Sequence, residues 1–259
     1  MATRIVSRAL SVLLASTAAA HAGVYIESIE RNTKSEETGE LHRFWAQDGN
    51  ARVEAGKNVT LLKGESMVVI DTKQKTYMLL DRAAITQMAG QMKDMQAQMD
   101  AQLAGLPPEQ RAMAERMMRG SIPGGGAAAP QIERVDTGES EQANGRACRL
   151  WNVKRNGELT QQQCVVPYST LPGEENLREV VERMASLTEA LQRSLPQAEA
   201  SSEIAGGMNG YPVLTRYFER GKPTGRERRV TAWREESVAG DKFEIPRGFE
   251  QRKMPGAPD

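Results

Sequence analysis

The sequence predicts an α+β protein in which a mostly antiparallel sheet is combined with amphipathic helices. Short apolar runs separated by turn residues fill residues 24–81, and further runs surround the turn at 154–157. Two other segments, 82–106 and 174–195, carry apolar residues at helical spacing. Because the strands come in groups and do not alternate singly with helices, we expect hairpin-connected, antiparallel pairing.

The N-terminal residues 1–22 have the features of a cleavable secretory signal peptide. Arg4 and Arg8 precede the apolar stretch 9–19, and small residues follow in Ala20-His21-Ala22, where a signal peptidase would cleave. At about 1.5 Å per residue this stretch is too short for a hydrocarbon core of about 30 Å. We therefore expect an exported, periplasmic protein, free in solution, with no transmembrane segment.

Residues 24–81 are predicted to form five strands in meander order. The pair Asp48-Gly49 lies between two apolar-bearing runs and is a strong hairpin signal. Asn58-Val59-Thr60 fits the glycosylation pattern, and we interpret that match as chance. The five strands are expected at residues 24–26, 40–46, 51–55, 66–71 and 76–80.

A Met-rich helical insertion is predicted at 82–121, because the apolar period changes from two to about 3.6 after Leu80. Pro107-Pro108 interrupts the helix, and the Gly/Ala/Pro-rich residues 122–130 are expected to be a flexible linker. Three interpretations of the insertion stay open: packing against the sheet, a mobile lid over an apolar cavity, or a copper(I) site of clustered thioethers. The stripe on this helix comprises Ile85, Met88, Met92, Met95, Met99, Gln102/Leu103 and Leu106.

After the linker the sequence returns to strands around one long helix. Residues 174–195 are expected to form an amphipathic helix that Pro196 ends. Its apolar face carries Leu177, Val180, Val181, Met184, Leu187, Leu191 and Leu195. Residues 251–259 are expected to be a disordered tail. Strands are predicted at 132–135, 146–153, 158–166, 211–219 and 227–235, and residues 242–246 follow them.

Cys148 and Cys164 are the only two cysteines in the chain. In an exported protein, oxidising conditions favour a disulfide between them. A three-residue loop over 155–157 with Gly157 in the left-handed conformation would place the two cysteines directly opposite each other, close enough for a bridge. The alternative, a redox-active pair, lacks the closely spaced Cys-x-x-Cys form typical of reactive dithiols.

The ionisable residues argue against most enzyme and nucleic-acid functions. The chain has 34 basic and 34 acidic residues, and loss of Arg4 and Arg8 with the signal peptide would leave a net charge of −2. Near-neutrality argues against nucleic-acid binding. His42 would be the only histidine of the exported chain, in a predicted strand without a nearby nucleophile signature. We therefore expect no enzyme activity, no bound metal and no cofactor; a hydrolase with two carboxylates is unsupported.

Several short motifs occur in an order that resembles their order in a known family. They are Phe44-Trp45, Ala51–Glu54, Met67–Asp71, Lys75–Asp81, Thr137–Glu139, Asn144–Cys148 and Phe243–Phe249. Together they resemble an exported bacterial family of unknown function that is similar in fold to lipoprotein carriers of the LolA and LolB type. The resemblance implies that residues 23–250 form one half-barrel domain. Its curved, incomplete β-barrel would carry helices on the concave face, with an apolar cavity between them.

These observations lead to two functional hypotheses. The first is an exported, non-enzymatic binding protein that holds a hydrophobic ligand, such as an acyl chain, lipid or lipoprotein, in the half-barrel cavity. The second is an envelope or stress-related module that docks a partner protein through its Met-rich helices, with no small ligand. The residues expected to line the binding site are Met88, Met92, Met95, Met99, Leu103, Leu177, Val181 and Met184.

Overall fold

A computed structural model describes residues 22–35, 37, 39–107, 110–111, 131–194 and 209–252, without the side chains of 92, 96 and 188–194. The predicted signal peptide, except Ala22, lies outside the described residues. So do most of the second half of the Met-rich insertion, the linker at 122–130 and nearly all of the tail.

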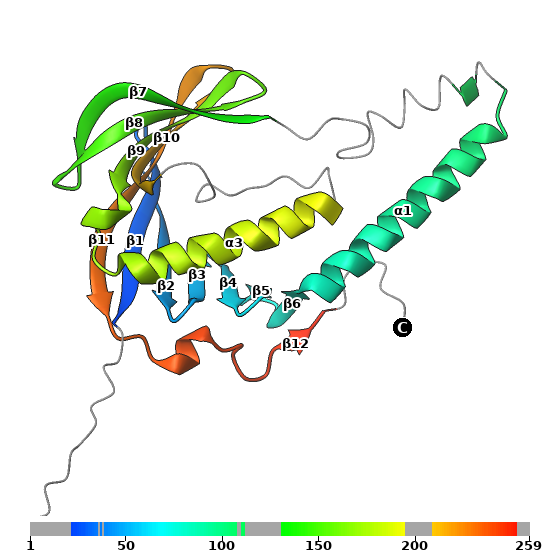
Figure 1. Cartoon of the computed structure of the whole chain (residues 1–259), viewed down its shortest axis with the longest axis horizontal. Helices are drawn as coiled ribbons and strands as arrows, with labels where there is room; N and C mark the ends of the chain where they lie inside the picture. The colour runs from blue at the N-terminus through cyan, green and yellow to red at the C-terminus, as the bar shows by residue number, and fades with distance from the viewer. Residues whose placement is uncertain are drawn as a thin grey trace, which may run out of the picture.

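The described residues form one curved, unclosed sheet of twelve strands with two α-helices (Figure 1). The strand order is β12-β6-β5-β4-β3-β2-β1-β11-β10-β9-β8-β7, and only the β12–β6 pair is parallel. An α+β class with a curved antiparallel sheet is therefore confirmed. The strands are β1 Gly23–Asn32, β2 Glu40–Gln47, β3 Asn50–Ala55, β4 Asn58–Lys63, β5 Ser66–Asp71, β6 Thr76–Leu80, β7 Ile132–Ala143, β8 Arg146–Arg155, β9 Glu158–Pro167, β10 Gly210–Glu219, β11 Lys222–Glu236 and β12 Glu250–Gln251.

The N-terminal meander has six strands, one more than predicted. The additional strand is β4, in which Val59, Leu61 and Leu62 are buried. Val59 and Leu61 on either side of the polar Thr60 give a strand signal in the sequence. Gly56 and Gly64, on either side of β4, have φ values of +54° and +58°, as tight turns require.

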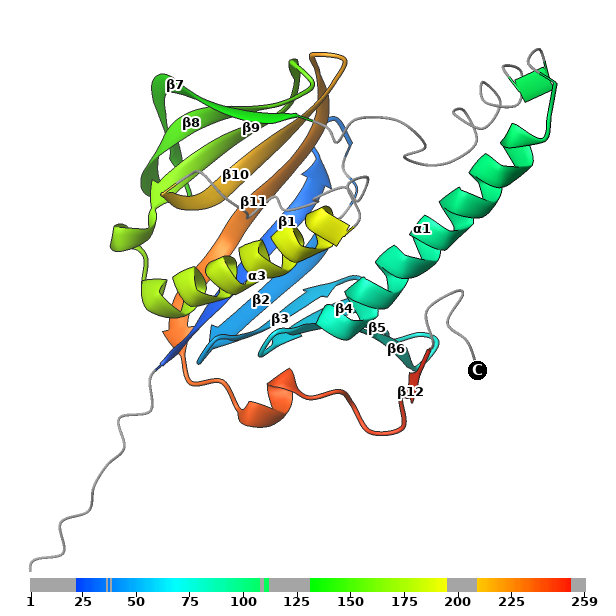
Figure 2. The same ribbon diagram turned by 45° about the vertical axis from the view of Figure 1, so that its right-hand side comes forward.

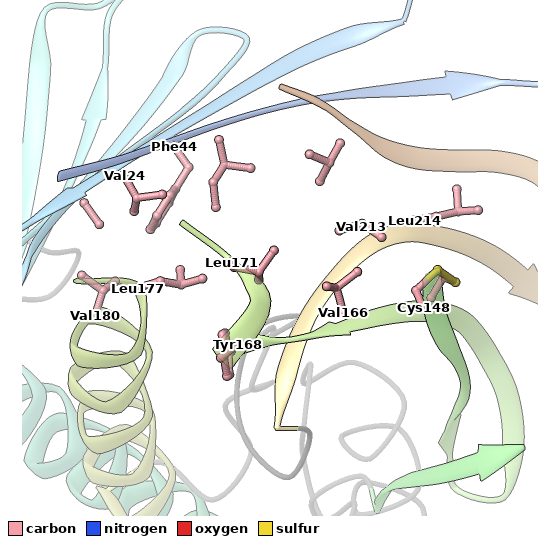
Figure 3. Packing of buried hydrophobic residues seen from close by; sticks show 14 of the residues in the cluster. Val24, Phe44, Cys148, Val166, Tyr168, Leu171, Leu177, Val180, Val213 and Leu214 are labelled. Carbon is pink, nitrogen blue, oxygen red and sulfur yellow. A yellow bond between two sulfur atoms is a disulfide. The ribbon is translucent and has the colours of Figure 1, made fainter. Parts of the chain in front are cut away.

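Helix α3 (Glu174–Ser194) covers the concave face of the sheet (Figure 2). Leu177 and Val180 are fully buried and belong to the same core cluster as Val24 and Phe44 of the first two strands (Figure 3). The predicted helix, with this face turned to the sheet, is therefore confirmed over the described residues. The inner face of the N-terminal strands is filled by side chains of α3.

Residues 237–252, which follow β11, cover the opposite face of the N-terminal strands. Successive residues of a strand point to opposite sides, so Tyr25 and Trp45 face away from α3. Both pack against Val238 and Phe243 in a second apolar cluster. Residues 242–246 were expected to follow the last long strands. They include the end of a short 3₁₀ helix, η2 (Gly240–Phe243). Beyond it, β12 pairs with β6.

Helix α1 (Arg82–Ala104) does not pack on the concave face, where the resemblance to the carriers would place it. It begins directly after β6 and extends away from the sheet, and only its first part lies beside α3 and β6 (Figures 1 and 2). Asp81 caps the helix, accepting a hydrogen bond of 2.7 Å from the backbone N–H of Ala84. Only Asp81 separates β6 from the helix, and α3 already occupies the inner face of the N-terminal strands.

The disulfide between Cys148 and Cys164 is present, with a Cα–Cα distance of 5.3 Å. The predicted register is wrong, however, because Cys164 lies opposite Leu150. Asn156 and Gly157 both have positive φ, which makes the turn a two-residue type I′ hairpin, and a bulge near Lys154 shifts the pairing further. The bridge therefore joins diagonal neighbours within the buried core.

Candidate binding groove between α1 and α3

A groove of about 310 Å³ lies where the first residues of α1 meet α3 and the β4–β5 turn. Its lining combines an acidic and two basic side chains with one apolar side chain, Leu187, which is buried. Three separate parts of the chain contribute to it. The lining residues are Gly64, Glu65, Arg82, Arg183, Ser186 and Leu187.

The β2–β3 turn fixes the position of Arg183. Gly49 in this turn has a φ of +69°, and a Cβ atom there would lie 2.4 Å from the guanidinium carbon of Arg183 and 2.5 Å from Oε1 of Glu179. Arg183 donates a hydrogen bond of 2.6 Å to Glu179, one turn earlier on α3. The absence of a side chain at Gly49 thus lets this ion pair pack directly against the sheet.

A second contact holds the beginning of α3 to the same turn. The side-chain oxygen of Asn176 accepts a hydrogen bond of 2.9 Å from the backbone N–H of Asp48. The side-chain nitrogen of Asn176 donates a bond of the same length to the backbone oxygen of Ala22. Helix α3 is therefore fixed by both polar contacts and core packing, which gives the groove one rigid wall.

The other wall is the first turn of α1. Ile85 is 5% exposed and anchors this end of the helix, whereas Arg82 projects into solvent at 67% side-chain exposure. The Arg82 Nε atom lies 3.2 Å from a carboxylate oxygen of Glu65. A guanidinium has five N–H donors, so an arginine paired in this way can also bind a carboxylate that enters the groove.

The structure places the predicted site residues in two groups. On α3, Leu177 is fully buried in the core, and Val181 and Met184 are partly buried against it. On α1, Met88, Met99 and Leu103 are partly buried, and Met95 is 53% exposed. Met92 lies in the same helix, and its side chain is outside the described residues.

Sequence reasoning missed the charged lining of the groove. Glu65, Arg82 and Arg183 are far apart along the chain, and each looks like an ordinary surface charge in its own segment. The available signal was the position of Arg82, directly after the last strand of the meander and at the start of a helix. Nothing in the sequence connects it with Arg183.

A separate polar network crosses the other half of the sheet. Arg216 of β10 donates hydrogen bonds of 2.5 and 2.8 Å to the two carboxylate oxygens of Glu141 on β7, and another of 3.2 Å to Gln162. The hydrogen bond from Arg216 lowers the pKa of Glu141 below its ordinary value, and Glu141 raises the pKa of Arg216. These carboxylate contacts have the character of a structural ion pair.

Two further observations concern the described part of the chain. No group of three or more His, Cys, Asp or Glu side chains there is arranged to hold a metal ion. Neither described helix is long and apolar enough to cross a membrane.

No family model matches the chain. No curated protein matches it either. Several solved structures show partial similarity. An uncharacterized conserved protein from Thermus thermophilus has 8% sequence identity and a TM-score of 0.45, with 90% of each chain covered.

Other matching structures contain the protein MucB. In one, MucB in complex with MucA(peri), the identity is 11% and the TM-score 0.32, with 91% of this chain and 58% of that chain covered. In the Pseudomonas aeruginosa MucA/MucB complex, the identity is 12% and the TM-score 0.31, with coverages of 87% and 56%. Because these TM-scores are below 0.5, they carry no functional argument for this chain.

Proposed function

We propose that this chain is an exported, non-enzymatic interaction module that binds a segment of a partner protein in the groove between α1 and α3. The observation that carries the proposal is the pair of arginines, Arg82 and Arg183, on two different walls of a groove that also contains Leu187. This lining suits a segment that presents one apolar side chain next to carboxylates.

Charge and size both favour a peptide segment. The groove has two basic lining residues and one acidic one, and charge-assisted bonds between arginine and a carboxylate are among the strong hydrogen bonds in proteins. A volume of about 310 Å³ is at the lower end of the range for small-molecule sites. A single anchoring side chain fits such a space better than a long acyl chain does.

The carrier hypothesis is less well supported by the same geometry. A lipid carrier needs an apolar cavity, and beside the N-terminal strands the concave face is occupied by Leu177 and Val180 of α3. Three of the six residues that line the groove are charged. Binding of an acyl chain therefore becomes an alternative outcome of the test.

The test is fluorescence anisotropy of the full chain with a labelled amphipathic peptide that carries one leucine anchor and flanking glutamates. We expect the double variant Arg82→Gln/Arg183→Gln to bind this peptide at least about tenfold more weakly, because two charge-assisted contacts are lost. Arg178→Gln is the matched control: Arg178 is on α3, pairs with Glu174 at 3.3 Å and does not line the groove.

Two results would count against the proposal. Equal affinity of the double variant and the unchanged chain would remove the groove as the binding site. Native mass spectrometry that found a co-purified lipid, together with displacement of that lipid by Leu187→Trp, would favour the carrier hypothesis in its place.

A further inference from the structure

Strand β7 forms one edge of the sheet, and Figure 1 shows it as the outermost strand of the upper half. It pairs with β8, and no strand lies beyond it in the part of the chain that the structure describes. The backbone N–H of Asn156 donates a hydrogen bond to the backbone oxygen of Gln131. Bonded and non-bonded pairs alternate along an antiparallel ladder. The backbone groups that point to the open edge are therefore those of Ile132, Arg134 and Asp136.

A bulge closes this edge beyond Asp136. Residues 137–139 lie opposite a single residue of β8. Gly138 in the bulge has a φ of +77°, and its backbone N–H donates a hydrogen bond of 2.9 Å to the side chain of Asp136. Bulges of this kind protect a sheet edge from pairing with another chain. The regular residues 132–136 have no such protection, and at about 3.4 Å per residue they form an open stretch of about 17 Å.

Arg134, in the middle of the open stretch, lacks a partner. Its Nε atom is buried and makes no hydrogen bond within the described ranges of the chain. Burial lowers the pKa of Arg134 below its ordinary value, and no acidic group opposes this shift. A partly buried guanidinium is stabilised when a carboxylate comes beside it. The open edge therefore has places for both a new strand and a carboxylate.

A second copy of the same edge supplies both. Two β7 strands can pair antiparallel about a two-fold axis that passes through Val135. This register places Arg134 of each copy opposite Asp136 of the other, and the backbone groups of both residues point to the edge, as regular pairing requires. The two nearest registers with the same hydrogen-bond pattern place Arg134 opposite Arg134, or Asp136 opposite Asp136. Like charges directly opposite each other are destabilising, so charge selects the register with Val135 on the axis.

We infer that β7 pairs with β7 of a second copy of this chain, so that the protein forms a symmetric dimer whose two sheets continue through residues 132–136. A symmetric contact uses the same surface on both copies. Asp136 already lies 3.1 Å from a side-chain nitrogen of Arg149, and a carboxylate has about four lone-pair sites, enough to accept from a second guanidinium. Because the paired stretch is short, the dimer is reversible and depends on concentration.

The first experiment is sedimentation equilibrium of the full chain and of charge-reversal variants. The unchanged chain should dimerise. Arg134→Asp and Asp136→Arg should each raise the dimer dissociation constant at least about tenfold, because each variant places like charges opposite each other. An equimolar mixture of the two variants should associate again, because every opposed pair then joins opposite charges. Glu158→Lys is the matched control: Glu158 is exposed at the start of β9, outside the paired stretch, and its reversal should leave the dimer unchanged.

The second experiment is cysteine cross-linking, which does not depend on the charged pair. Val135→Cys should form a disulfide between two copies under oxidation, because Cβ atoms at directly opposed positions are about 4.5 to 5.5 Å apart. Glu133→Cys is its control on the same strand. In this register the two copies of residue 133 are four residues apart along the strands, about 13 Å, too far for a bridge.

Other results would overturn the inference. A chain that stays monomeric at all concentrations would exclude a second copy as the occupant of the edge. A dimer that persists in both single charge reversals, a mixture of them that fails to associate, or equal cross-linking at positions 133 and 135 would exclude this register. The inference is independent of the groove, because Arg82→Gln/Arg183→Gln leaves β7 unchanged and should dimerise normally.

Discussion

At the scale of single residues, the ion pair between Arg216 and Glu141 joins two strands that are not neighbours. In the sheet order β8 and β9 lie between β7 and β10, and adjacent strands are about 4.8 Å apart. A curled sheet shortens the distance that these two side chains must span. The two hydrogen bonds of the pair therefore help to hold the curvature of this half of the molecule.

The lowered pKa of Glu141 predicts how this contribution depends on pH. A carboxylate whose pKa is lower in the folded state stabilises the fold above its ordinary pKa, and this contribution is lost as the pH falls through the folded value. Glu141→Gln should therefore lower the free energy of unfolding by about 1 kcal/mol near pH 7. Urea unfolding should show that this difference shrinks as the pH falls below the ordinary pKa of glutamate and through the lower pKa of the folded state. A difference that persists at low pH would mean that the ion pair is not its cause.

At the scale of elements, the hairpin of β8 and β9 is closed by a disulfide that spans 16 residues. For a loop of about this size, removal of the bridge costs about 3 kcal/mol, mainly because the unfolded chain gains freedom. We expect the double variant Cys148→Ser/Cys164→Ser to lose about this much stability in urea unfolding. The unchanged chain with reductant should show a similar loss, and an unaffected midpoint in both experiments would contradict the prediction.

Helix α1 contains an interior glycine, Gly90, with open space where a Cβ atom would lie. Replacing such a glycine with alanine removes a helix penalty of about 1 kcal/mol. Gly90→Ala should therefore slow amide hydrogen exchange in α1 about fivefold, with no change in α3. Equal slowing in both helices would show that α1 does not open separately from the rest of the fold.

Local sequence patterns predicted most of the helices and strands, but not which of them contact each other. The period of 3.6 in residues 82–106 identifies a helix with one apolar face, and says nothing about what covers that face. Two cysteines in an exported chain predicted the disulfide. The register depended on the two-residue turn that Asn156-Gly157 signals and on the bulge near Lys154, which has no sequence signal. The strand at Asn58–Lys63 was visible in the alternation of Val59 and Leu61.

At the scale of the whole molecule, the curved sheet and the two helices produce a groove that no segment contains by itself. Glu65, Arg82 and Arg183 meet because β6 leads directly into α1 at one edge of the sheet while α3 crosses its concave face (Figure 1). This depends on long-range packing, which the sequence pattern does not specify. The fold class was therefore predictable and the groove was not.

The most direct test of the proposed function is to map where a bound peptide contacts the chain. The acidic amphipathic peptide, with a photoreactive group in place of its apolar anchor, would be cross-linked to the full chain, and the modified residues identified by mass spectrometry. We predict cross-links at 64–65, at 82–88 and at 183–187, and their loss in Arg82→Gln/Arg183→Gln. Cross-links confined to β7 or to the outer face beneath η2, with none in the groove, would contradict the account.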